Sequence, residues 1–176
     1  LRQTPLVLQL LGAENLPVQT SYGVLRKVIQ DKHRLSPELI NQIPSAMADP
    51  IMVLRTGSDS ALSDVTMMLE LKDEHGATVV VPVALKKQDG GYSINFVPSM
   101  YVKNDAATNA PRDRWFVRQV EDGNALYINR EKMKHWLRTS QRQLLGGEAS
   151  SSVAMKASGN KKLLTEDDLV KLREAN

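Results

Sequence analysis

The sequence predicts an α+β fold with helices first, a run of strands next and a helix near the end. Two observations support this class. Three segments in the first 50 residues have the apolar spacing of short helices, whereas from Ile51 onward apolar residues follow the period of a sheet. Short turns join the strands in succession, which predicts a four- to five-stranded antiparallel sheet.

Two of the three expected helices have a start signal in the sequence. Thr4 is an N-cap candidate before proline, and the apolar segment from Leu6 to Gly12 follows it. A second helix is expected over residues 21–33. Ser36 before Pro37 opens a third helix, which we expect Pro44 to limit or to turn, since proline disfavours a helix interior.

The strands begin with the compact apolar run Ile51 to Leu54. Residues 65–71 and 78–85 flank a turn that ends near Gly76, a pattern typical of a hairpin. A further strand is expected from Tyr92 to Tyr101, with a local irregularity at Pro98 because proline cannot donate to a strand ladder.

After a polar loop over residues 104–112, a short helix is expected at 114–120 and a short edge strand at 124–128. Asn129 then caps a helix running to about Leu145, ended by Gly146 and Gly147. We therefore predict one domain over residues 1–147, a flexible linker over 148–162 from its Ser, Gly, Ala and Lys content, and a short amphipathic helix over 163–176.

Composition excludes several classes of protein. The chain has 176 residues, 41% hydrophobic and 24% charged, as an ordinary soluble domain does. Cysteine is absent, and the three histidines are too few for a structural zinc site, so neither a metal nor a cofactor is expected. The first residue is leucine and nothing after it resembles a signal peptide, so we expect the chain to be a piece of a longer polypeptide.

Positive charge is concentrated in the middle of the chain. Residues 86–142 carry 11 Lys and Arg against 6 Asp and Glu, whereas residues 1–85 carry 7 against 9. Such a bias suits a polyanion such as nucleic acid, and it equally suits a solvated basic face.

Three groups of residues could carry chemistry. His33 follows Lys27 and Lys32 on the second expected helix, where it could transfer a proton beside a bound phosphate; as an alternative, it interacts with the last carbonyls of that helix. We expect His75, in the hairpin turn, and His135 to be solvated.

The second group lies at the end of an expected strand. Ser99, Tyr101 and Lys103 share one face by the period of two, and could orient and stabilise a phosphate; an ordinary polar edge is the other interpretation.

The third group is a basic stripe of Arg130, Lys134 and Arg138 at helical spacing. It suits a nucleic-acid backbone or simply keeps the outer face of the helix soluble. No phosphate-binding glycine loop, zinc-protease motif or nucleophile elbow is present in the sequence.

Taken together, several motifs in order resemble the C-terminal domain of phage MuF-type polyvalent proteins. The motifs are Leu6 to Gly12, Lys27 with Lys32 to Ser36, Ala48 to Ile51, Thr78 to Val83, Asn95 to Tyr101, and Leu126 to Asn129 with Trp136. The resemblance extends over roughly residues 4–145. One departure is Val102, where many relatives have glycine after the tyrosine.

That family belongs to a group of predicted metal-independent ribonucleases and toxins that includes barnase-, EndoU-, colicin- and RelE-like domains. The resemblance implies N-terminal helices packed on an antiparallel sheet, with an RNA-cleaving site between them formed by Lys27, Lys32, His33, Ser99 and Tyr101. Cleavage would proceed by attack of the RNA 2'-hydroxyl on the adjacent phosphate. Lys103, Arg130, Lys134 and Arg138 would bind the nucleic acid.

The expected partners are RNA, a cognate immunity or antitoxin protein and the rest of a larger parent protein, with no membrane. The expected site of action is the bacterial cytoplasm, reached by phage or by a secretion system. The alternative hypothesis is a non-catalytic nucleic-acid- or protein-binding module of a phage structural protein, because a fold does not by itself establish activity.

Overall fold

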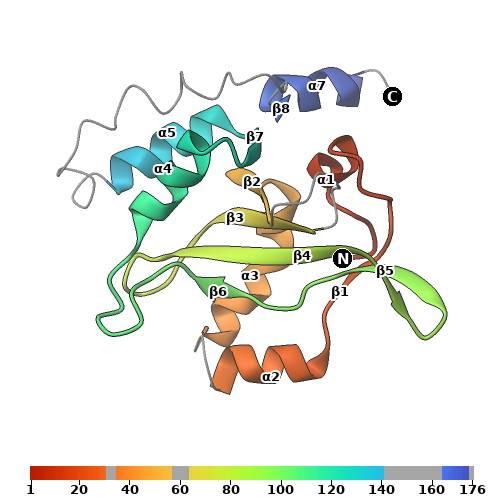
Figure 1. Ribbon diagram of the computed structural model, residues 1–176, viewed down its shortest axis with the longest axis horizontal. Helices are drawn as coiled ribbons and strands as arrows, with labels where there is room; N and C mark the ends of the chain where they lie inside the picture. The colour runs from red at the N-terminus through yellow and green to blue at the C-terminus, as the bar shows by residue number, and fades with distance from the viewer. Residues whose placement is uncertain (31–34, 57–63, 141–163, 175–176) are drawn as a thin grey trace.

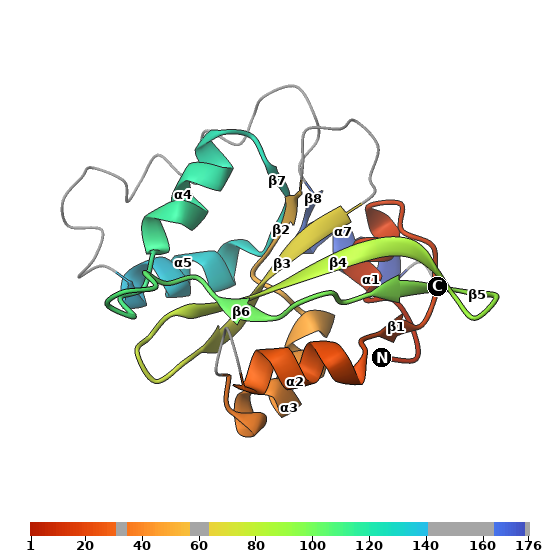
Figure 2. The ribbon, with the colours of Figure 1, turned by 60° about the horizontal axis from the view of Figure 1, so that its bottom comes forward.

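The computed structural model describes residues 1–30, 35–56, 64–140 and 164–174. Within these ranges, six helices and an eight-stranded sheet confirm the predicted α+β class. The sheet lies in the middle, with α2 and α3 on one side and α4 and α5 on the other (Figures 1 and 2). None of the described helices is long and apolar enough to span a bilayer.

The helices are α1 (Leu6–Leu10), α2 (Tyr22–Gln30), α3 (Pro37–Ala48), α4 (Asp113–Glu121), α5 (Arg130–Thr139) and α7 (Glu166–Glu174). The strands are β1 (Val18–Gln19), β2 (Met52–Arg55), β3 (Asp64–Lys72), β4 (Thr78–Asp89), β5 (Tyr92–Phe96), β6 (Tyr101–Val102), β7 (Ala125–Ile128) and β8 (Leu164–Thr165). The predicted linker, residues 148–162, lies outside the described residues.

Two predicted helix caps are confirmed. The Ser36 hydroxyl accepts a hydrogen bond from the backbone N–H of Leu39 at 3.2 Å, and the Asn129 side chain accepts one from Lys132 at 3.0 Å. Pro44 does not end α3, which continues to Ala48 because Ile43 and Met47 are buried on its inner side.

The sheet is mixed rather than antiparallel, with the order β1-β5-β4-β3-β2-β7-β8. Strands β2, β3, β4, β5 and β7 pair antiparallel as expected, but β1 runs parallel to β5 and β8 runs parallel to β7. Consequently β7 is not an edge strand. Strands of two residues have no alternation that a sequence pattern could reveal.

The expected strand from Tyr92 to Tyr101 is divided in two. Strand β5 pairs with the end of β4, from Ala84 to Asp89, whereas β6 pairs with Val79 and Val80 near its beginning. Pro98 lies between the two pieces, where a residue without an N–H interrupts the ladder.

Two hydrophobic clusters cover opposite faces of the sheet. Alternate residues of β4 divide between them: Val79 and Val81 belong to the first cluster and Val80 to the second. Helices α1, α2 and α3 pack on the first cluster, and α4 and α5 on the second. The sheet therefore separates two surfaces of the protein.

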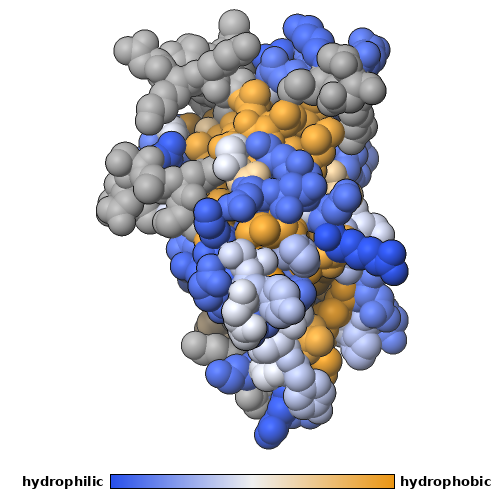
Figure 3. Space-filling model, turned by 90° about the vertical axis from the view of Figure 1, so that its right-hand side faces the viewer, coloured by the Kyte–Doolittle hydropathy of each residue, from blue (hydrophilic) through white to orange (hydrophobic). Residues whose placement is uncertain are grey.

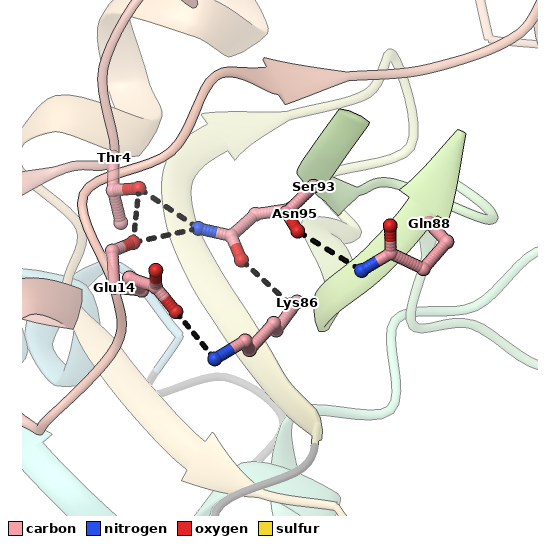
Figure 4. A network of polar contacts seen from close by, with 6 residues as sticks. All are labelled: Thr4, Glu14, Lys86, Gln88, Ser93 and Asn95. Atoms are coloured by element: carbon pink, nitrogen blue, oxygen red, sulfur yellow. Dashed lines mark hydrogen bonds and ion pairs between the residues drawn. The ribbon is translucent and has the colours of Figure 1, made fainter. Parts of the chain in front are cut away.

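A buried amide joins the N-terminal segment to the β4–β5 hairpin (Figure 4). The fully buried Asn95 donates from its side chain to the Thr4 hydroxyl at 2.8 Å and to the Glu14 carbonyl at 3.2 Å, and it accepts from the backbone N–H of Lys86 at 2.9 Å. The expectation that Thr4 caps α1 is therefore wrong. Pro5 is at the N-cap position, and the Thr4 hydroxyl donates to carbonyls within residues 14–16.

We predict that Asn95→Ala lowers the free energy of unfolding by about 2 to 3 kcal/mol, because buried partners would lose their hydrogen bonds. Urea unfolding measures the change. Ser93→Ala, which removes only an exposed hydrogen bond to Gln88, is the matched control and should shift stability by less than about 0.5 kcal/mol. Equal stability of the two variants would contradict an anchoring role for Asn95.

Candidate functional site

Of the predicted catalytic residues on the α2 side, the structure describes Lys27 alone. Lys27 is exposed on α2, whose Val28 is buried in the first cluster. Lys32 and His33 lie outside the described residues. The described part of α2 extends to Gln30, and the rest of the helix expected up to His33 lies outside the described residues.

Two of the residues predicted at the strand end, Tyr101 and Lys103, lie on the α4 side of the sheet. Tyr101 is half-buried against the second cluster, and burial raises the pKa of its phenol. The ammonium of Lys103 lies 4.1 Å from the centroid of the Trp115 ring, which favours a cation–π contact. Burial, and secondly the nearby Arg112, lower the pKa of Lys103. Ser99 is half-buried just before β6.

These positions do not form one constellation in the described structure. Helix α2 packs on the first cluster, whereas Tyr101 packs on the second, so the sheet lies between the two groups. Lys27 and Tyr101 are thus assigned to different faces, as Figure 2 also shows for α2 and α4.

An open pocket of about 400 Å³ lies between the start of α3, the β3–β4 turn and the loop after β6. Its lining residues are Leu35, Ser36, Glu38, Leu39, Gln42, Lys72, Asp73, Glu74, His75, Val102, Asn104 and Asn109. Leu35 and Val102 lie close in sequence to the predicted sites around His33 and Tyr101. The pocket is therefore lined by a neighbour in sequence of each predicted site.

The lining of this pocket is more acidic than basic. Glu38, Asp73 and Glu74 line it together with Lys72 and His75. The imidazole Nε2 of His75 lies 3.3 Å from the Glu74 carboxylate, and Asp73 accepts hydrogen bonds from the backbone of the turn. His75 is close to half exposed, in keeping with the expected solvated turn, but it also lines the pocket. Three carboxylates disfavour a phosphate here.

The opposite layer presents a basic surface. We define it by five exposed residues on the outer sides of α4 and α5: Arg114, Arg118, Arg130, Lys134 and Arg138. Exposed carboxylates on the same two helices are Glu121 and Glu131, and Glu131 pairs with Lys134 at 3.0 Å. The predicted stripe on α5 is thus exposed, and α4 extends it with two arginines that the sequence analysis did not single out.

Lys132, the other lysine of α5, has a different role. It is partly buried, and its ammonium lies 2.7 Å from the Glu70 carboxylate and 3.1 Å from that of Asp49. Burial opposes its charge, but the hydrogen bonds to Glu70 and Asp49 raise its pKa overall. This ion pair fastens α5 to β3 and to the end of α3.

Aromatic and polar contacts hold the α4–α5 layer on the sheet. The indole N–H of Trp136 donates to the Thr78 hydroxyl at 2.8 Å, and its ring meets Phe116 edge to face at 5.4 Å. The buried Asp113, in the first turn of α4, is hydrogen-bonded to Ser140 just beyond α5. Burial raises the pKa of the Asp113 carboxyl more than Ser140 and Lys72 lower it.

Sequence reasoning could have found Arg114 and Arg118, since they have the same spacing as the stripe on α5. The acidic pocket had no such signal, because three separate segments line it. Across the described ranges, no three His, Cys, Asp or Glu side chains gather as a metal ion would require.

One comparison with known proteins gives a match. The family model of the phage MuF C-terminal domain matches residues 25–135. No curated protein and no solved structure matches the chain. The match contains α3, α4, strands β2 to β7 and most of α2, but it excludes β1, β8 and α7.

We predict that Asp113→Asn flattens the pH dependence of stability. Because burial raises the Asp113 pKa above 3.8, the folded chain holds this proton more tightly than the unfolded chain does. The stability contributed by Asp113 is complete below pH 3.8 and is lost as the pH rises through the raised native pKa.

Urea unfolding of the parent chain and of Asp113→Asn, at pH values from below 3.8 upward, measures the effect. The exposed variant Glu121→Gln is the control. The excess stability of the parent chain over Asp113→Asn should decline with rising pH. An excess that grows with pH would show that the native pKa is lowered instead.

Proposed function

Since the chain belongs to the phage MuF C-terminal domain family, we propose that it is a module of a phage structural protein that binds nucleic acid through the basic surface of α4 and α5. A C-terminal domain is part of a longer polypeptide, so this module would act within a larger parent protein. The exposed basic surface is the observation that carries the proposal.

The chemistry of that surface suits a phosphate backbone better than a specific small ligand. Arg114 and Arg118 are four residues apart on α4, and Arg130, Lys134 and Arg138 repeat the same interval on α5. Each row therefore presents cations along one helix face. Binding of this kind releases counterions and depends steeply on salt.

We predict that replacing Arg130, Lys134 and Arg138 with Ala weakens binding to duplex DNA and to RNA at every sequence. Loss of three phosphate contacts should make the slope of log affinity against log salt shallower by about 2 to 3. Fluorescence anisotropy over a salt series measures both quantities.

The matched control replaces Arg2, Arg26 and Lys87, which are exposed, carry the same total charge and lie outside α4 and α5. It should retain most of the affinity and the slope of the parent chain. Equal losses in both triple variants would mean that net charge, and not this surface, produces the binding.

A metal-independent ribonuclease is the second candidate function. Its support is the pocket beside Leu35 and Val102, which are neighbours in sequence of Lys32 with His33 and of Tyr101 with Lys103. In this hypothesis His33 transfers the proton, Ser99 and Tyr101 orient the phosphate, and Lys27, Lys32 and Lys103 stabilise its charge. An immunity protein and a bacterial cytoplasmic target belong to this second candidate only.

Under the ribonuclease hypothesis, the purified chain should degrade total RNA in EDTA. His33→Ala should lower the rate by about 10²- to 10⁴-fold, and Tyr101→Phe should lower turnover with little change in affinity. His135→Ala is the control, since His75 lines the pocket. RNA that is bound but stays intact at high protein concentration would eliminate this candidate and leave the binding module.

A further inference from the structure

Both ends of the sheet are closed by short parallel strands from outside the family match. Strand β1 pairs with β5 through Val18 and Gln19, and β8 pairs with β7 through Leu164 and Thr165. Without these two strands, β7 would form one end of the sheet and β5 the other. Such edges present unpaired backbone groups that can pair with another strand.

The closure at β1 is anchored inside the protein. Val18 and Thr4 are buried, and the Thr4 hydroxyl is bonded to the buried amide of Asn95. The backbone N–H of Val18 also donates to the Leu1 carbonyl at 2.9 Å. Opening this end would expose a completed polar network and apolar side chains, at a high cost in free energy.

The closure at β8 rests on more exposed contacts. The Glu166 carboxylate accepts from the backbone N–H of Arg130, the first residue of α5, with both oxygens at 3.1 Å. Asp168 accepts from the backbone N–H and hydroxyl of Thr165, which holds the turn between β8 and α7. Leu164 and Leu169 are only partly buried against the first cluster, and Val170 is exposed.

Figure 3 shows the side of the molecule to which α7 belongs. Apolar side chains gather on the side of the molecule where α1 and α7 lie, interrupted by polar ones (Figures 1 and 3). The β8–α7 segment, residues 164–174, is thus the closure that separates at lower cost. It covers the edge of β7 and the adjacent backbone N–H of Arg130, which donates to the Glu166 carboxylate.

The segment that occupies this site in the structure shows what kind of chain can bind there. It is an apolar residue and a threonine in extended conformation, followed by acidic residues at the start of a helix. Residues 141–163 connect α5 to this segment, and a connection of 23 residues can extend to about 80 Å. That reach allows the segment to occupy the same site on a neighbouring copy of the chain.

We infer that the β7 edge and the first turn of α5 form a docking site for residues 164–174, filled either by the same chain or by a second copy. Two chains then associate by exchanging their β8–α7 segments. Within one chain, a connection of this kind gives an effective concentration in the millimolar range, so the closed monomer dominates in dilute solution. Exchange grows as the chain concentration approaches that range.

The absence of cysteine in the chain makes the exchange directly measurable. Ile128 and Thr165 are opposite one another in the β7–β8 register. One sample of full-length chain carries Ile128→Cys, a second carries Thr165→Cys, and the two are mixed under mild oxidation. A disulfide-linked heterodimer forms where β8 of one copy lies on β7 of the other, and oxidation accumulates it even from a minor population.

Two controls make the result decisive. The double variant I128C/T165C should form the bond within one chain, which verifies the docked geometry. Mixing Ile128→Cys with Ser45→Cys, an exposed position on α3, gives the background from random collisions. We expect the Ile128 and Thr165 pair to yield several-fold more heterodimer than this background, increasing with concentration.

A heterodimer yield equal to the background, with the intramolecular bond formed, would overturn the exchange. Failure of the double variant to form its bond would overturn the docking site itself. Should Ile128→Cys unfold the chain, Arg130→Cys with Glu166→Cys carries the same test at positions outside the core, where the native carboxylate contacts the backbone N–H. This inference is independent of nucleic-acid binding, since none of the five residues of the basic surface contributes its side chain to the site.

Discussion

The buried amide of Asn95 is the contact on which the geometry of the β4–β5 end depends. Its oxygen accepts the N–H of Lys86, a residue held at a positive φ of 52°, next to the register shift between Ala84 and Lys87. Its nitrogen donates to Thr4 and thereby holds the N-terminal segment beside β5. A left-handed backbone at a non-glycine residue costs roughly 1 kcal/mol, and this hydrogen bond helps to offset it. One side chain therefore holds both the irregular register between β4 and β5 and the position of the strand that closes the sheet.

The sheet held in this way divides the protein into two surfaces with different chemistry. On the α4–α5 side, polar anchors such as Trp136 with Thr78 and Lys132 with Glu70 are directed inward, so the arginines are left on the outer surface. On the α2–α3 side, the pocket beside α3 collects carboxylates from the β3–β4 turn and from Glu38. Electrostatics therefore directs a polyanion to the basic surface of α4 and α5 and away from the pocket. This contrast favours binding over cleavage more strongly than any single residue does.

Local signals in the sequence predicted much of the fold, and non-local contacts account for what they missed. The prediction that Ser36 and Asn129 cap helices was correct, because capping depends on three or four neighbouring residues. The prediction that Thr4 caps α1 was wrong, because its hydroxyl is hydrogen-bonded to residues remote in sequence, Asn95 among them. Strands β1 and β8 were missed because two residues carry no period. For the candidate site, exposure of the stripe on α5 followed from helical spacing, but the separation of Lys27 from Tyr101 by the sheet depends on which face each element covers, and period alone does not determine that.

The boundaries of the family match separate the central sheet from the strands that close its two ends. The matched region, residues 25–135, contains the central sheet and most of the basic surface, and the pieces that close the two ends of the sheet come from outside it. One closure is buried with its polar groups satisfied and the other is held by exposed contacts. A change in the flanking segment 164–174 can therefore alter how the β7 edge is covered while the cations of α4 and α5 stay in place. Binding of a polyanion and association between copies would then be properties of separate parts of the chain, because no side chain of the basic surface is needed to close the edge.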